Sequence, residues 1–244
     1  MSTRLDHVVL GVPDLRSGQA ELAGPGLRFA SGGRHPGGTE NALLVTPKRW
    51  SYVELITASE KETSGEASSV AVRVRQGGLV AWALAVEDVD TQVNLLAEAG
   101  FECQPVEPGS RETTDGRLVQ WRIAVIGPSF GQSELPFLIE WAASDARRTG
   151  LAPDDQAAYL TEIEVGVRDM EQMRAFLGVL GLAAGSADDE MECSDGEVQM
   201  RFVEGEPRLS AVCLALPDGR RVRITDRLQP RRLCVRIDMA EGVG

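Results

Sequence analysis

One pattern of turn residues occurs three times and limits the folds that this chain can adopt. The segments GVPDL (11–15), AVEDV (85–89) and GVRDM (166–170) each follow a short apolar run. Each also precedes a stretch in which apolar residues recur at helical spacing. The distance from the aspartate to a later glycine is 12 residues in every copy: Asp14 to Gly26, Asp88 to Gly100 and Asp169 to Gly181.

Each copy of this pattern predicts a strand followed by a helix of about three turns. The aspartate is suited to the helix N-cap, where its carboxylate accepts from free backbone N–H groups. The glycine is suited to a left-handed residue just after the helix. Short alternating runs separated by Gly, Pro, Asp and Asn follow each glycine and are typical of antiparallel strands. The repeated unit is therefore predicted to be βαβββ.

The spacing of the three units predicts the domain organisation of an α+β protein. We expect residues 1–142 to contain the first two units, over 5–57 and 79–142. The polar segment 143–158 is expected to be a linker. Residues 159–244 are expected to hold a third unit with a C-terminal strand.

Composition narrows the class of protein and of partner. The chain has 244 residues, 43% of them hydrophobic, which is typical of a globular protein. Its net charge of −12 disfavours nucleic acid and anionic membranes as partners. The four cysteines form no C-x-x-C pair, and the sequence has neither a signal-peptide pattern nor an apolar stretch long enough to cross a bilayer. We expect a cytoplasmic protein.

The repeated βαβββ units, a histidine shortly before the first V-x-D turn and a glutamate on the last strand together resemble the vicinal oxygen chelate superfamily. This group includes lactoylglutathione lyase, extradiol dioxygenases and bleomycin-resistance proteins. The segment GGRHPGGTENALLV (32–45) is similar to the glyoxalase-like domain proteins within it. The resemblance implies that the first two units pair into an open barrel around a pocket, where a metal is held by the first and the last strand of each unit.

Aligning the units on the V-x-D turn transfers the four ligand positions to this chain. The first unit supplies His7 and Glu54. The second unit supplies Glu140, in FLIEW, while its first-strand position holds Ala81. The resemblance therefore implies a divalent metal (Zn, Fe, Mn, Co or Ni) on His7, Glu54 and Glu140, and the alanine at the fourth position favours a protein without metal.

Other polar side chains are candidates for the same pocket. His35, in the HPGGTEN loop, is predicted to complete the ligand shell or to act in catalysis, and Asn41 shares that loop. Trp121 and Arg122 lie on opposite faces of one predicted strand, so one of them should point inward. An inward Arg122 would bind an anionic or carbonyl-bearing substrate. Glu54 and Glu140 are also candidates for the general base.

The third unit carries an opposite-charge pair where the others carry ligands. Glu162 lies five residues before Val167, as His7 lies before Val12, and Arg223 follows the PDG turn on what is taken as the last strand. We expect Glu162 and Arg223 to lie side by side on adjacent strands. The tail strand 232–238 and a second copy of the chain, in a homodimer, would cover the remaining sheet edge.

Two functions of different classes remain open from the sequence. The first is a metal-dependent lyase, isomerase or dioxygenase that acts on a small molecule with neighbouring oxygens. The alternative is a metal-free protein that binds a small molecule, as the bleomycin-resistance relatives do.

Overall fold

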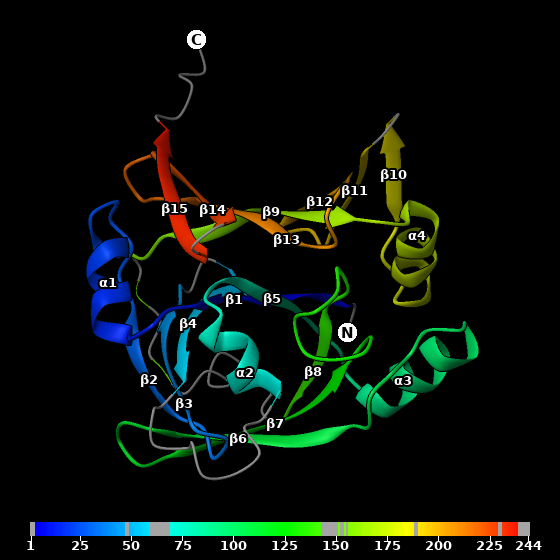
Figure 1. Cartoon of the computed structure of the whole chain (residues 1–244), viewed down its shortest axis with the longest axis horizontal. Coiled ribbons are helices and arrows are strands. Elements are labelled where there is room, and N and C mark those ends of the chain that lie inside the picture. The colour runs from blue at the N-terminus through cyan, green and yellow to red at the C-terminus, as the bar shows by residue number, and fades with distance from the viewer. Residues whose placement is uncertain are drawn as a thin grey trace.

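The computed structural model of the chain describes residues 3–46, 49–58, 69–142, 151, 154, 156–187, 190–228 and 231–238. Most of the predicted linker 143–158 lies outside the described residues. The described strands form two sheets that lie one above the other, a barrel and an open sheet (Figure 1).

The first two units form the barrel. The first unit contains β1 (Arg4–Gly11), α1 (Leu15–Ala23), β2 (Ala30–Arg34), β3 (Thr39–Leu44) and β4 (Tyr52–Ala58). The second contains β5 (Gly78–Ala85), α3 (Val89–Glu98), β6 (Glu107–Thr113), β7 (Leu118–Val125) and β8 (Phe137–Trp141). The strand order β1-β4-β3-β2-β6-β7-β8-β5 closes on itself, because β1 also pairs with β5. The predicted pairing of the two units around one interior is confirmed.

The seam between β2 and β6 closes the far side of this barrel. It consists of two residue pairs, Gly33 with Thr113 and Arg34 with Glu112. Gly33 has a φ of 146°, and a Cβ there would lie 1.9 Å from the carbonyl oxygen of Glu112. Only glycine allows the two strands to approach this closely.

The repeated aspartates and glycines have the predicted local structure. Asp14, Asp88 and Asp169 are N-caps, and each carboxylate accepts from the backbone N–H three residues later. The three paired glycines all have positive φ: Gly26 at 102°, Gly100 at 90° and Gly181 at 73°. These are short-range effects of capping chemistry, so the sequence alone was sufficient to predict them.

The third unit begins the second sheet but does not complete a barrel. It contains β9 (Tyr159–Val167), α4 (Met170–Val179), β10 (Ala184–Ala187), β11 (Glu190–Ser194) and β12 (Gln199–Glu204). Three further strands follow: β13 (Arg208–Ala215), β14 (Arg221–Leu228) and β15 (Arg231–Asp238). The order is β10-β11-β12-β9-β13-β14-β15, and β12 pairs parallel with β9 as β4 does with β1. The last strand of the unit is thus β12, and the assignment of that role to the strand after PDG is wrong.

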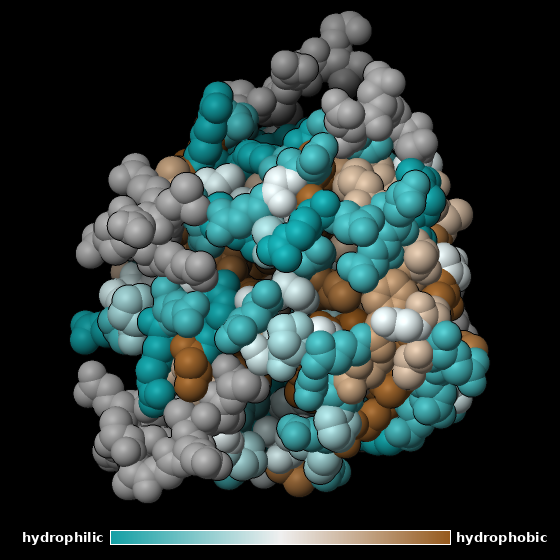
Figure 2. Space-filling view, turned by 45° about the vertical axis from the view of Figure 1, so that its right-hand side comes forward, coloured by the Kyte–Doolittle hydropathy of each residue, from teal (hydrophilic) through white to brown (hydrophobic). Residues whose placement is uncertain are grey.

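Apolar side chains join the barrel to the second sheet. The ring of Trp82, on the outer face of β5, packs near the ring of Phe202 of β12, with 6.1 Å between the ring centroids. Phe101 and Phe176 meet edge to face at 5.4 Å between the segment after α3 and helix α4. One buried apolar cluster contains residues from both sheets, so they share a core. On the face drawn in Figure 2, hydrophobic residues lie between hydrophilic ones instead of forming a continuous apolar surface.

Two elements differ from the prediction and shape the barrel. The alternating run directly after Gly100 was expected to be a strand, but the strand next to β7 is β6, which begins at Glu107. Helix α2 (Ser69–Arg75) was not predicted; it contacts β1 and β4, and Figure 1 shows it in front of the barrel. None of the helices in the described part of the chain combines the length and apolar character that a membrane span requires.

Candidate functional site

The interior of the barrel holds a cavity of about 260 Å³. Alternate residues of its strands point inward, which divides the lining into an apolar and a polar part. The apolar part includes large side chains of β7 and β8 and residues of neighbouring segments: Ile56, Val70, Trp121, Ile123, Phe130, Phe137, Ile139 and Trp141. The polar part contains His7, His35, Thr39, Asn41, Glu54 and Arg111. An apolar enclosure with a few convergent polar groups is the usual form of a small-molecule site.

His7 and Glu54 meet in this cavity, as predicted. β1 and β4 pair in parallel, with Val9 opposite Glu54 and His7 opposite Tyr52. Both side chains therefore point to the inner face, and Nε2 of His7 lies 3.5 Å from Oε2 of Glu54. His7 is 3% exposed and Glu54 is 8% exposed. The ring of Tyr52 stacks on His7 at 4.7 Å and limits its rotation.

Asn41 holds the other oxygen of Glu54. Its Nδ2 donates to Oε1 of Glu54 at 2.6 Å, while its Oδ1 accepts from Nη1 of Arg111 at 3.2 Å. Burial lowers the pKa of Arg111, and the nearby Glu54 carboxylate acts in the opposite direction. The polar end of the cavity therefore contains an anion and a cation linked through one amide. Asn41 lines the cavity from strand β3, although it was predicted to lie in a loop. Arg111 was not predicted, because its strand β6 was not recognised.

His35 also lines the cavity, as predicted. Its Nδ1 lies 2.7 Å from Oγ1 of Thr39, and its ring meets Trp121 edge to face at 5.7 Å. Burial lowers the pKa of His35 below the ordinary value of 6.5, against the opposing charge of Glu54. The imidazole is therefore neutral near pH 7 and carries a lone pair, as a base or a metal ligand requires.

Glu140 and Arg122 lie outside the cavity, so the predicted convergence of three ligands and the inward Arg122 are wrong. Oε2 of Glu140 accepts from the backbone N–H of Val89 at 2.9 Å, at the start of α3. Arg122 forms ion pairs with Glu140, at 3.4 Å, and with Asp90 of α3. Helix N-termini favour nearby carboxylates because the first N–H groups lack partners within the helix. Of Trp121 and Arg122, it is Trp121 that points inward.

Strand pairing identifies the residue of the second unit that corresponds to Glu54. Val9 lies three residues before Val12 and pairs with Glu54; Ala83 lies three before Val86 and pairs with Phe137. The second unit thus presents Ala81 and Phe137 at the positions equivalent to His7 and Glu54. Both are apolar. The polar end of the cavity therefore comes from the first unit and from Arg111, and the second unit mainly supplies wall.

Asp6 is the most enclosed polar residue near the cavity and was not predicted. Its exposed fraction is 0%. Its Oδ1 lies 2.7 Å from Nδ1 of His7, and its Oδ2 accepts from Nε1 of Trp50 and of Trp141, each at 3.0 Å. The only signal in the sequence was a second ionisable residue beside His7 in an apolar run. Strand alternation places such a neighbour on the opposite face, so the pattern argued against it.

The polar side chains of the cavity do not make up the metal-binding set that the resemblance implies. Two of the four ligand positions hold Ala81 and Phe137, and Glu140 points away. Within the residues that the structure describes, no group of three or more His, Cys, Asp or Glu side chains is arranged to hold one ion. His7 and Glu54 remain the two ligand-type residues at the expected positions.

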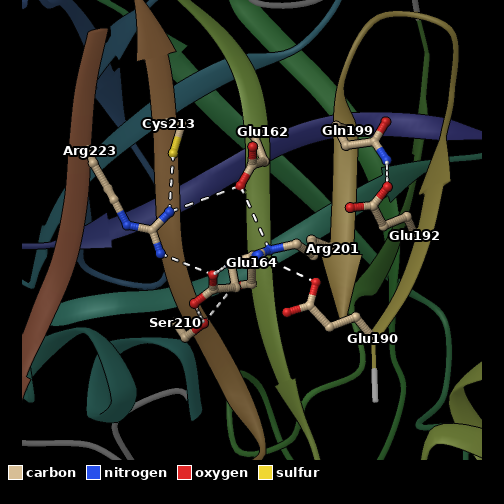
Figure 3. Close-up of polar contacts among 9 residues, drawn as sticks. All are labelled: Glu162, Glu164, Glu190, Glu192, Gln199, Arg201, Ser210, Cys213 and Arg223. Atoms are coloured by element: carbon tan, nitrogen blue, oxygen red, sulfur yellow. Dashed lines mark hydrogen bonds and ion pairs between the residues drawn. The ribbon is translucent and has the colours of Figure 1, made fainter. Parts of the chain in front are cut away.

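The open face of the second sheet carries an ion-pair cluster (Figure 3). Arg223 lies 3.9 Å from Glu162 and 3.0 Å from Glu164, and Arg201 also pairs with Glu164. The contact of Glu162 with Arg223 was predicted, but their strands are not adjacent, because β13 lies between β9 and β14. Burial raises the pKa of Glu164, yet hydrogen bonds from Arg201, Arg223 and Ser210 outweigh this effect and lower it overall.

Solved structures with the same fold cover almost the whole chain. A hypothetical protein from Staphylococcus aureus superposes with a TM-score of 0.72 at 17% identity, over 96% of this chain and 98% of the other. A mutant of 4-hydroxymandelate synthase from Streptomyces coelicolor superposes with a TM-score of 0.53 at 12% identity, over 100% of this chain and 95% of the other. At these identities the likeness concerns the fold alone. No curated protein matches the sequence.

The family of glyoxalase-like domains matches residues 5–181, which include both barrel units and the first helix of the third unit. This range covers His7, His35, Asn41 and Glu54 as well as Asp6. The solved structures above share the repeated βαβββ architecture of this chain. The chain therefore belongs to the glyoxalase-like domain family.

Proposed function

We propose that the barrel binds a small, partly apolar molecule that bears a carbonyl or carboxylate oxygen, and that His7 and Glu54 move a proton on it. The observation that carries this proposal is the approach of His7 Nε2 and Glu54 Oε2 to 3.5 Å at the polar end of a cavity whose other walls are apolar. Buried ionisable groups are costly without a role or a partner, and their convergence in a cavity favours proton transfer.

The chemistry follows from the two ends of the cavity. The apolar wall, with Trp121, Phe137 and Trp141, holds the body of the substrate away from water. Glu54 takes a proton from carbon next to the carbonyl, the C–H electrons pass to the oxygen, and the proton returns to a neighbouring atom. The positive charge of Arg111 at the same end of the cavity favours the enolate oxygen. Isomerisation and elimination share this first step.

A divalent metal does not enter this mechanism, because the residues present fall short of the expected ligand set. His7 and Glu54 would be its protein ligands in the barrel, and His35 lines the same cavity. Metal analysis of protein purified without a histidine tag tests this directly. If the wild-type protein contains a stoichiometric transition metal and the Glu54→Gln variant does not, the metal-dependent reaction becomes the favoured function.

The second candidate function is binding without chemistry. It is favoured by the apolar Ala81 and Phe137 at two ligand positions, and by the hydrogen bond that holds Glu54 to Asn41. Such a protein would protect or sequester its ligand in the same cavity.

One experiment separates the two functions. A panel of dicarbonyls, thiol adducts of dicarbonyls and catechols is incubated with the protein in D₂O, and proton NMR follows both ligand binding and C–H exchange. We expect exchange that falls about 10²-fold or more in Glu54→Gln. The matched control is Glu140→Gln, the last-strand glutamate of the second unit, which lies outside the cavity and should leave exchange unchanged. Ligand binding without exchange in the wild-type protein would support the binding function instead.

A further inference from the structure

We infer that Asp6 is a positioning residue that fixes the tautomer of His7, so that the Nε2 lone pair faces the cavity. The inference deepens the proposed function, on which its catalytic consequence rests. It concerns a residue that does not itself line the cavity and acts through His7.

A bulge brings Asp6 to the side of His7. In regular strand, consecutive side chains point to opposite faces. The pairing of β1 with β5 shifts between Leu5 and His7, which pair with Leu84 and Ala83, and Asp6 is the extra residue. Its carboxylate can therefore reach Nδ1 of the next residue at 2.7 Å. Bulges are found next to active sites because they redirect one side chain in this way.

The two oxygens of Asp6 have different partners, which determines where the proton lies. Indole N–H groups only donate, so Oδ2 must accept from both Trp50 and Trp141. Oδ1 faces Nδ1 of His7. A carboxyl group is far more acidic than an imidazolium, and its N–H partners favour the ionised form, so the shared proton belongs to Nδ1. In a neutral imidazole, Nε2 then carries no hydrogen.

The far side of the ring agrees with this assignment. An N–H group that donates to a carboxylate usually lies 2.7–2.9 Å from it, whereas Nε2 of His7 and Oε2 of Glu54 are 3.5 Å apart. Two acceptors that face each other need a proton donor between them. A substrate hydroxyl or an enol would satisfy both groups, which makes the pair a receptor for such a group.

The change Asp6→Asn should reverse the tautomer. The amide has one acceptor and one donor end, and the two indole N–H groups require the acceptor at the Oδ2 position. The amide NH₂ then takes the Oδ1 position and donates to Nδ1 of His7. The ring must carry its hydrogen on Nε2, where it would donate to Glu54 and remove the free lone pair. Because asparagine has nearly the same volume as aspartate, Asp6→Asn changes the tautomer of His7 with little change in packing.

Nitrogen NMR of the histidine rings tests this inference without a substrate. The chain has two histidines, so ¹⁵N-histidine labelling gives a simple spectrum, and His35→Gln assigns it. At about pH 8, where free imidazole is neutral, we expect protonated Nδ1 and bare Nε2 for His7 in the wild-type protein. We expect the reverse in Asp6→Asn, with C–H exchange reduced about 10²-fold.

The matched control is Asp195→Asn. Asp195 accepts from the backbone N–H of Leu5 at 2.8 Å, next to Asp6, but no contact joins it to His7 within the described residues. The Asp195→Asn substitution removes one negative charge close to the start of β1, as Asp6→Asn does, and should leave the His7 tautomer unchanged. A wild-type His7 protonated on Nε2 would overturn the inference even if Asp6→Asn failed to fold. The expected tautomers without any C–H exchange would contradict the proposed function and leave the role of Asp6 standing.

Discussion

The barrel and the second sheet place different chemistry at equivalent positions of the same unit. His7, Val9 and Glu54 on β1 and β4 correspond by strand pairing to Glu162, Glu164 and Arg201 on β9 and β12. In the barrel these positions face an enclosed cavity. In the second sheet they face outward, where Glu164 and Arg201 neutralise each other.

Closure explains this difference. β5 begins a complete second unit that bends back to β2. In the described part of the chain β13 is followed by β14 and β15 alone, so the second sheet remains open. Each polar group on an enclosed face needs a hydrogen-bond partner from the protein or a bound ligand. On an open face, polar groups are hydrated or form ion pairs with one another. The same βαβββ unit therefore supplies a site only where a second unit closes over it.

The largest expected effect comes from opening the barrel at its seam. Gly33→Ala places a Cβ 1.9 Å from the carbonyl oxygen of Glu112 and should lower the free energy of unfolding by about 3 kcal/mol. Urea denaturation measures this change. The seam should also loosen, which would expose the cavity to a fluorescent apolar dye.

Two glycine variants serve as controls for this effect. Gly185→Ala, on β10 of the open sheet, has its nearest neighbour at 3.9 Å and should change stability by less than about 0.5 kcal/mol. Gly116→Ala has a φ of 80° and open space, so it isolates backbone strain of about 1 kcal/mol. If Gly33→Ala cost no more than Gly116→Ala, closure at this seam would not matter for stability.

A smaller effect is expected from the ion pairs on the open face. Arg223 contacts the half-buried Glu162 at 3.9 Å and the more enclosed Glu164 at 3.0 Å. Double-mutant cycles with Arg223→Met should give a coupling of about 1 kcal/mol for Glu164→Gln and about 0.2 kcal/mol for Glu162→Gln. Urea unfolding of the single and double variants provides both values. A stronger coupling to Glu162 would return Glu162 to the role predicted from the sequence.

The smallest effects are expected from pH, because each depends on one protonation equilibrium. The pKa of His35 in the folded protein is lowered from 6.5. As pH decreases below 6.5, the unfolded chain therefore binds a proton that the folded protein does not, and the free energy of unfolding falls. The pKa of Glu164 is lowered from 4.5, so its contribution is lost below pH 4.5. The barrel and the second sheet should thus respond in separate pH windows.

Variants at these residues assign the two windows. His35→Gln should flatten the slope of unfolding free energy below pH 6.5 and keep the acid window, and Glu164→Gln should do the opposite. Unfolding curves at intervals between pH 3.5 and 8 measure both slopes. A wild-type protein whose stability is unchanged between pH 6.5 and 5 would show that His35 titrates normally.

Local chemistry could be predicted from the sequence, and strand register could not. The caps at Asp14, Asp88 and Asp169 depend on three neighbouring residues and were correct. Glu140 was placed in the cavity because it is the glutamate of the last strand. The pairing of Ala83 with Phe137 turns it outward. That pairing is a contact between distant segments, which alternation within one strand does not determine.

The site shows the same limit. His7, Glu54, Asn41 and His35 were predicted from motif and resemblance, and all four line the cavity. Asp6 was missed because a single bulge reverses the face on which it lies. A bulge arises from the partner strand, so the sequence of β1 alone contains no sign of it.

The third unit holds the residues that anchor the start of β1, and this has a consequence for synthesis. Asp195 accepts from the N–H of Leu5, and Glu197 accepts from the backbone N–H of Trp50, whose indole donates to Asp6. During translation all barrel strands leave the ribosome before residue 195 is made. Domains generally fold as they emerge, so the nascent barrel forms first with this end of β1 unsupported. The backbone on either side of Asp6, at Leu5 and at its partner Trp50, would gain these contacts only near the completion of the chain.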